Sequence, residues 1–135
     1  MRREIIKNYN IENKIVLLKG NFKNMIKVRW TLDEAVVLLN LYFCKGGSKN
    51  ISDKDLEELT NLYKNRAKRL GIIFDKKFRN CSGLRMQLGC IQYVVTNGQE
   101  GMSNCSRVFY DAYDLYKKEP EKFQQMLDNV YDKYF

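Results

Sequence analysis

Histidine is absent from all 135 residues of the chain. It is the commonest metal ligand and the side chain that most readily exchanges protons near neutral pH. Its absence therefore excludes most metal sites and most acid–base mechanisms. We expect a protein that binds another molecule, that is not an enzyme and that uses no cofactor.

Proline is also scarce, and the cysteines lack paired spacing. The four cysteines are Cys44, Cys81, Cys90 and Cys105, and no two of them form a C-x-x-C pair. A zinc site built from all four would need unusual spacing, so we expect reduced, mostly buried thiols. The chain has one proline, 44% apolar residues and 30% charged residues. This composition is typical of a globular and mainly helical protein.

Long hydrophobic runs are missing as well. No segment approaches the roughly 18 uninterrupted apolar residues that a membrane span needs. The first residues are basic, but only two apolar residues follow Glu4, which does not fit a secretory signal. We expect a cytoplasmic protein without membrane contact.

The positive charge is abundant and unevenly distributed. The net charge is +8, and it is concentrated in residues 1–29 and 63–88, each with eight Lys or Arg. Two glutamates oppose the first group and Asp75 opposes the second. Two basic blocks on a slightly acidic body indicate a surface for a polyanion. The alternative is a lysine-rich proteome, in which the charge serves only solubility.

Capping signals and helical spacing predict about five helices. Thr31 and Glu34 form a capping box before an apolar run that ends at Lys45-Gly46-Gly47, and such a helix must be central. Ser52 and Asp55 begin a second helix, from Asp53 to about Leu70. Ser82 caps a third, which runs to about Val95. The last two helices are expected at about 106–118 and 120–134.

The third helix, residues 83–95, has a polar strip between two apolar faces. The strip holds Arg85, Gly89, Gln92 and Thr96, and the last three lie within about 40° of Arg85 around the helix. A glycine here costs up to about 1 kcal/mol relative to alanine. Two explanations are open: a ligand approaches the backbone closely at Gly89, or another part of the protein packs there.

The predicted fold is therefore a compact, mainly α bundle of about five helices. Residues 1–29 form a basic N-terminal segment, and residues 30–135 form the helical domain. The pattern of residues 13–28 fits a short β-hairpin or a short amphipathic helix.

Three segments resemble a recurring bacterial pattern: Trp30-Thr31…Glu34…Leu41-Tyr42-Phe43, Arg79-Asn80…Met86-Gln87-Leu88-Gly89, and Gly101-Met102-Ser103…Ser106-Arg107. The pattern is similar to the domain that precedes the HNH nuclease module in restriction-type endonucleases. The resemblance implies a helix-turn-helix-like DNA-binding domain whose recognition helix is residues 83–95. It also implies a restriction, phage-defence or mobile-element setting. Gln87 stands where a lysine is usual, and without a histidine any nuclease activity would come from a partner.

The leading hypothesis is a non-catalytic module that binds double-stranded DNA. Helix 83–95 would enter the major groove, where Arg85 reads guanine and Gln92 reads adenine. Loop and helix-start residues would hold phosphates, and a second group from the resembling motif would clamp the backbone. The predicted nucleic-acid-binding residues are Lys76, Lys77, Arg79, Ser82, Arg85, Gln87, Gly89, Gln92, Ser103, Ser106 and Arg107.

The alternative is a protein-interaction factor, such as an inhibitor or adaptor of a nuclease or of the transcription machinery. The 17 aromatic residues would then line part of an interface. A basic strip centred on Arg85 would favour DNA, and an exposed aromatic patch would favour a protein partner. The third hypothesis, a ribonuclease, would have to use Asp75 or Glu100 as its carboxylate.

Overall fold

The predicted helical bundle is confirmed by a computed structural model that describes residues 27–135. Residues 1–26 lie outside the described residues, and with them most of the hairpin or short helix expected at 13–28 and most of the basic segment 1–29. Within the described range there is no strand. The elements are α2 (Leu32–Cys44), the 3-10 turn η1 (Ser48–Asn50), α3 (Asp53–Leu70), α4 (Cys81–Val95), α5 (Arg107–Lys118) and α6 (Pro120–Tyr134).

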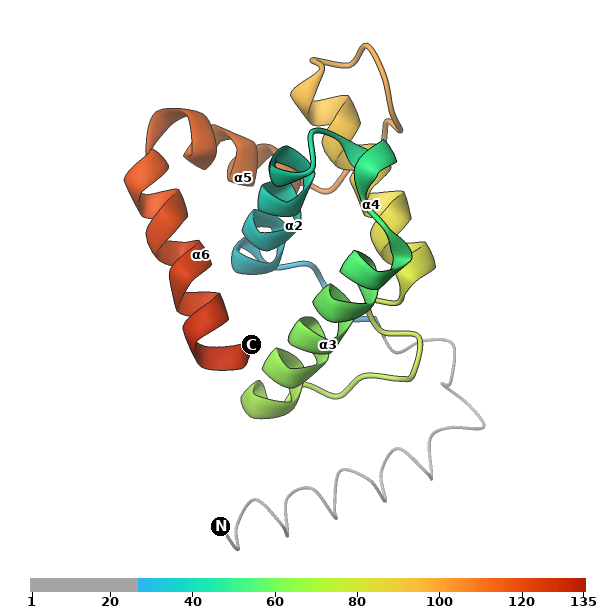
Figure 1. The fold of residues 1–135 in the computed structure, drawn as a ribbon, viewed down its shortest axis with the longest axis vertical. Helices are drawn as coiled ribbons and strands as arrows, with labels where there is room; N and C mark the ends of the chain where they lie inside the picture. Colours follow the sequence, from blue (N-terminus) through green and yellow to red (C-terminus); the bar gives the residue numbers. More distant parts are fainter. Residues whose placement is uncertain (1–26) are drawn as a thin grey trace, which may run out of the picture.

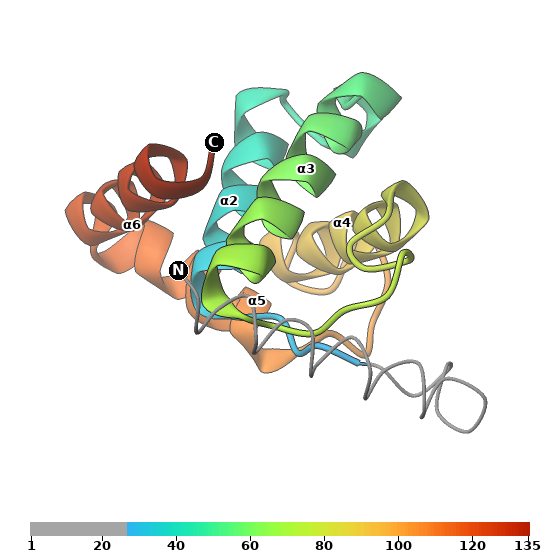
Figure 2. The same cartoon turned by 90° about the horizontal axis from the view of Figure 1, so that it is seen from below.

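Helix α2 is the centre of the fold, as its apolar sequence predicts. Its residues 34–39 are all buried, and it packs against α4, α5 and α6. Figure 1 shows α5 and α6 on one side of α2, with α3 and α4 on the other. The view from below in Figure 2 shows α3 crossing in front of this arrangement. A helix that is apolar on almost every face is stable only when it is covered in this way.

Helix α3 has both of the ends that its sequence predicts. The Ser52 backbone N–H donates to Asp55 Oδ2 (3.0 Å), and the Asp55 N–H donates to Ser52 Oγ (3.1 Å). The bond from the Ser52 backbone is the main reason that the pKa of Asp55 lies below its usual value. Gly71 ends the helix with a φ of 72°, in the left-handed region that suits glycine.

The connection between α3 and α4 is residues 71–80. The turn of a helix-turn-helix motif has three or four residues, so this pair of helices is joined by a longer segment. The cap of α4 also differs from the prediction. Asn80 is the N-cap residue and its Oδ1 accepts from Gly83 N–H (2.8 Å), while Ser82 lies in the first turn. Asparagine caps as well as serine does, and it stands two residues earlier.

Helices α5 and α6 are separated by Glu119 alone, with Pro120 at the first position of α6. Proline suits this position because its missing N–H has no partner at a helix start. None of the helices between residues 27 and 135 has the length and hydrophobicity that crossing a membrane requires.

Candidate nucleic-acid interface

Arg79 is an interior residue, and this corrects its prediction as a phosphate ligand. Its side chain is 7% exposed and forms a double ion pair with Glu34, with Nε to Oε2 at 2.9 Å and Nη2 to Oε1 at 3.0 Å. The guanidinium also stacks on the ring of Trp30, 4.3 Å from its centroid. All of its charge is therefore used inside the protein, and none is available for a phosphate.

The acidic pair at the start of α2 has a role that was not predicted from the sequence. Glu34 pairs with Arg79, and Asp33 pairs with Arg66, whose Nε lies 2.8 Å from Asp33 Oδ2. The hydroxyl of Tyr63 donates to the carbonyl of Glu34 (2.6 Å). Burial, followed by the charge of Glu34, raises the pKa of Tyr63 well above its usual value.

A signal for this network was present in the sequence. Glu34 stands next to the most apolar run of the chain, and a carboxylate buried there needs a cation. The network also contains Trp30, Thr31, Glu34 and Arg79, four of the residues that carry the family resemblance. In this chain, the contacts that these residues make within the fold are enough to explain their presence.

The polar strip of α4 is covered by the segment that follows it. A Cβ on Gly89 would lie 3.0 Å from Met102 Sδ, and the Gly89 carbonyl accepts from Met102 N–H (3.0 Å). The side-chain amide of Gln92 donates to Glu100 (2.7 Å). Of the two explanations for Gly89, the structure supports internal packing. Gln92 and Gly89 do not form an open edge.

The closest approach is made by Gly101. It has a φ of 91°, and a Cβ there would lie 2.4 Å from the Gly89 carbonyl oxygen and 2.6 Å from Tyr93 N. Only a residue without a side chain permits this contact. Two glycines, one on α4 and one in the segment, therefore allow residues 97–105 to lie directly on the helix.

Arg85 is exposed, but its guanidinium is already hydrogen-bonded within the protein. Its Nη2 donates to the Ile51 carbonyl (3.1 Å) and to Asp53 Oδ1 (2.8 Å). Gln87 is half-buried, and Ser82 is exposed at the start of α4. A basic strip centred on Arg85, which would favour DNA, is therefore not seen in the described part of the chain: only Arg85 itself is there, already paired with the Asp53 carboxylate.

The residues predicted to clamp the DNA backbone lie between α4 and α5 and at the start of α5. Ser103 is exposed, Ser106 is the N-cap residue of α5, and Arg107 lies 3.8 Å from Asp111. These residues flank Cys105, whose thiol lies 3.5 Å from the Cys90 carbonyl in the middle of α4. Lys76 and Lys77, in contrast, precede the start of α4.

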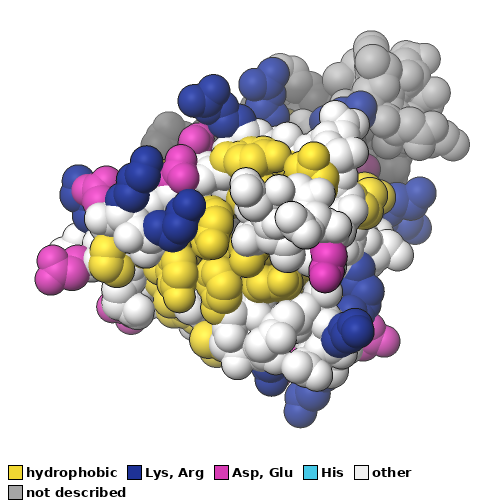
Figure 3. All heavy atoms as spheres, turned by 90° about the horizontal axis from the view of Figure 1, so that it is seen from above, with side chains coloured by type: hydrophobic (Ala, Val, Ile, Leu, Met, Phe, Trp, Pro, Cys, Tyr) yellow, Lys and Arg dark blue, Asp and Glu magenta, His cyan; other side chains and the backbone are white. Residues whose placement is uncertain are grey.

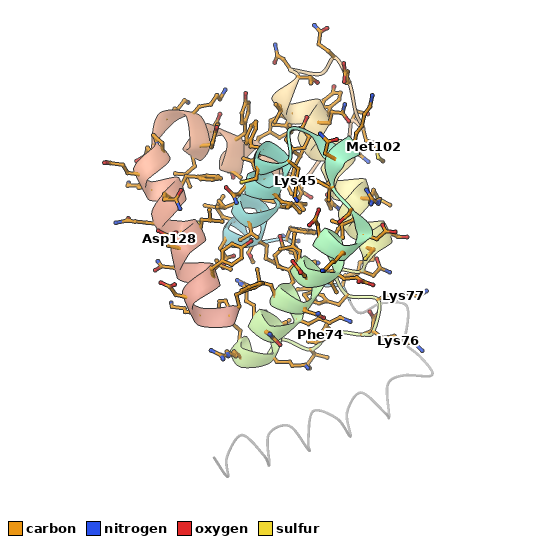
Figure 4. All side chains as sticks on the ribbon, viewed as in Figure 1. Lys45, Phe74, Lys76, Lys77, Met102 and Asp128 are labelled. Carbon is orange, nitrogen blue, oxygen red and sulfur yellow. The ribbon has the colours of Figure 1, made fainter. Side chains whose placement is uncertain are left out.

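Lys76 and Lys77 are exposed, and they belong to a larger group of cations. Figure 4 shows both side chains extending outward from the segment between α3 and α4. Thr60 Oγ1 donates to the Arg79 carbonyl (2.6 Å), so one face of α3 runs beside this segment. Lys64 and Lys68 follow Thr60 at intervals of four residues, on the same face.

The other side of this segment is formed by the start of the described chain. Arg79 donates to the carbonyls of Val28 (3.1 Å) and Arg29 (3.0 Å), and Lys27 and Lys77 line one hollow. We call the following cations the basic surface: Lys27, Arg29, Lys64, Lys68, Lys76 and Lys77. None of them forms an ion pair with another described residue. Asp75 lies among them, and its Oδ1 accepts from Lys77 N–H (2.9 Å).

The four cysteines are unpaired thiols, of which Cys90 is buried and Cys44 is exposed. Burial, followed by the interaction with Cys90, raises the pKa of the Cys105 thiol to about 12. Over residues 27–135, no cluster of three acidic or cysteine side chains has the arrangement of a metal site. No protein-family model, curated protein or solved structure matches the chain.

Proposed function

We propose that this protein binds double-stranded DNA through the basic surface. The observation that supports the proposal is a set of six cations without ion-pair partners in the described chain, accompanied by one carboxylate. A cation that is not neutralised by the protein can displace condensed counterions from DNA, which is the main source of affinity for phosphates.

Arg79 supports the proposal indirectly, because it holds the two segments that carry the cations. Its guanidinium is bound to the carbonyls of Val28 and Arg29, and its own carbonyl is bound to Thr60 on α3. The backbone segments that carry Lys27, Lys77 and Lys64 are thereby held in one arrangement before any ligand arrives. A preorganised backbone loses less conformational entropy on binding.

The proposed contacts are to the DNA backbone. Lysine contacts to phosphates position a protein on the duplex but carry no sequence information. Ser82, exposed in the first turn of α4, adds a helix N-terminus beside the lysines, which is favourable for a phosphate. We therefore propose binding with little sequence preference. The family resemblance is our reason for proposing a role in a restriction, phage-defence or mobile-element system in the cytoplasm.

The test is fluorescence anisotropy on a short random-sequence duplex at several salt concentrations. Neutralising about 5 phosphates predicts a log–log slope near −4.5. The double variant Lys76→Ala/Lys77→Ala should bind more weakly and lower the slope by about two units. The control is Lys117→Ala/Lys118→Ala, which removes the same charge from the C-terminal end of α5. Absence of binding at low salt, or equal losses in both double variants, would contradict the proposal.

A second candidate function is binding of a protein partner at the opposite end of the molecule. Figure 3 shows hydrophobic side chains gathered on the face that lies at the top of Figure 1. At the C-terminal end of α2, Phe43 stacks on Tyr116 of α5 with ring centroids 4.6 Å apart, and Tyr116 is 39% exposed. Exposed apolar patches are common at protein interfaces.

Photo-crosslinking distinguishes the two functions. A photoreactive amino acid is placed at position 116 in one preparation and at position 77 in another, both in the cells that produce the protein. Nuclease-sensitive adducts at position 77 favour DNA binding. Protein adducts at position 116, together with none at position 77, favour the protein partner.

A further inference from the structure

The basic surface contains a hollow with an aromatic wall. It lies between residues 27–28 and the segment 74–79, which are about fifty positions apart in the chain. Lys27 and Lys77 contribute cations, and Phe74 and Phe78 contribute rings whose centroids are 4.7 Å apart. Cations and rings together are suited to a ligand that has both a phosphate and a planar ring.

The two rings have different environments. Phe78 is 7% exposed and is covered by the Arg79 guanidinium, 4.5 Å from its ring centroid. Phe74 is only partly buried, so it can offer a surface to a ligand. Phe78 packs against Phe74, and Phe74 is the more exposed ring, on which a planar group can stack.

The walls of the hollow are held by backbone contacts. On one side, Arg79 binds the carbonyls of Val28 and Arg29. On the other side, the Phe78 N–H donates to the Asp75 carbonyl (3.1 Å), and Asp75 Oδ1 accepts from Lys77 N–H. The carboxylate of Asp75 also lines the hollow, where it can accept from an exocyclic amino group of a base.

We propose that this hollow takes one unpaired nucleotide of a DNA strand, with its base on Phe74 and its phosphate between Lys27 and Lys77. The proposal rests on the function proposed above and names its substrate more closely. A base inside a duplex is stacked on its neighbours and has no free face, so a duplex with an unpaired nucleotide is the preferred ligand. Stacking on an aromatic side chain tolerates any base.

The test compares a blunt duplex with the same duplex carrying one bulged 2-aminopurine nucleotide. We expect the bulged duplex to bind roughly tenfold more tightly, the size of one base–aromatic stacking contact. The fluorescence of the bulged base should change on binding, because stacking quenches it. Phe74→Leu should remove both effects while leaving the affinity for the blunt duplex unchanged.

Two control variants accompany Phe74→Leu. Phe74→Tyr keeps the ring and should keep the preference. Ile73 is an exposed neighbour of Phe74 in the chain and does not line the hollow. Ile73→Ala should therefore also keep the preference for the bulged duplex. Far-UV circular dichroism of each variant verifies that the helices are intact.

The outcomes separate this proposal from the proposed function. Equal affinities of the wild-type protein for the two duplexes would overturn the hollow as a site for an unpaired strand nucleotide and leave duplex binding standing. No binding to either duplex would overturn both. A direct titration with adenosine monophosphate tests whether the hollow instead binds a free nucleotide, which has the same base and phosphate. Binding of the free nucleotide that depends on Phe74, without any preference for the bulged duplex, would overturn an unpaired strand nucleotide as the ligand.

Discussion

Arg79 and Glu34 are 45 positions apart in the chain and form a double ion pair in the interior, with side chains 7% and 1% exposed. The pair joins the segment before α4 to the first turn of α2. The same carboxylate accepts from the Thr31 N–H, which is the capping bond of α2 (3.1 Å). One carboxylate therefore caps a helix and neutralises a buried cation at once.

Removing Arg79 should unfold or strongly destabilise the protein. Arg79→Ala leaves Glu34 buried without a cation, and breaking a buried pair in this way typically costs about 3–5 kcal/mol. Lys77→Ala, at an exposed position two residues away, should change the stability by less than about 0.5 kcal/mol. Urea denaturation of both variants measures the difference. Similar stabilities would contradict the interior role of Arg79.

Tyr63 should make the protein less stable at alkaline pH. Its pKa is raised well above 10 in the folded state, whereas in the unfolded chain it is about 10. The unfolded state thus loses a proton first, and the stability due to Tyr63 is complete below about pH 10 and declines above it. Tyr63→Phe should cost about 1 kcal/mol at pH 7, for the lost bond to Glu34, and should reduce the alkaline decline. Urea titrations at pH 7 to 11 test this; a decline of unchanged steepness in the variant would exclude Tyr63 as its source.

Gly101 should be essential for the contact between residues 97–105 and α4. Gly101→Ala combines a positive φ with a clash against the Gly89 carbonyl, so it should destabilise the protein by more than the roughly 1–3 kcal/mol of backbone strain alone. Gly98→Ala is the matched control, because its φ is also positive (86°) but its nearest neighbour, Tyr93, lies at 3.5 Å. The difference between the thermal unfolding temperatures of the two variants measures the effect of the clash. Equal losses would mean that backbone strain, and not close approach, determines the effect.

Arg85 should contribute little to DNA binding, in contrast to the prediction from the sequence. Its Nη2 is held by Asp53 and by the Ile51 carbonyl, so Arg85→Ala should leave the salt slope of DNA affinity unchanged. Lys77→Ala should reduce the slope by about one unit. Anisotropy titrations on the same duplex compare the two variants. A larger loss for Arg85→Ala would restore α4 as the recognition helix.

The helices and most of their ends could be predicted from the sequence. Thr31 with Glu34, Ser52 with Asp55, Gly71 and Pro120 all act within four residues of their own position. Such signals depend on local backbone geometry and can be read without the fold. The central position of α2 was also predictable, because a helix without a polar face has to be covered.

Which polar residues are free to bind a ligand depends on the tertiary structure. Arg79 and Lys77 are two positions apart and look alike in the sequence, yet Glu34, 45 positions before Arg79, makes one internal and leaves the other exposed. The strip of α4 looks open until Met102 and Gly101 are placed against Gly89. The availability of a side chain depends on what packs against it from distant parts of the chain, and local spacing carries no record of those contacts.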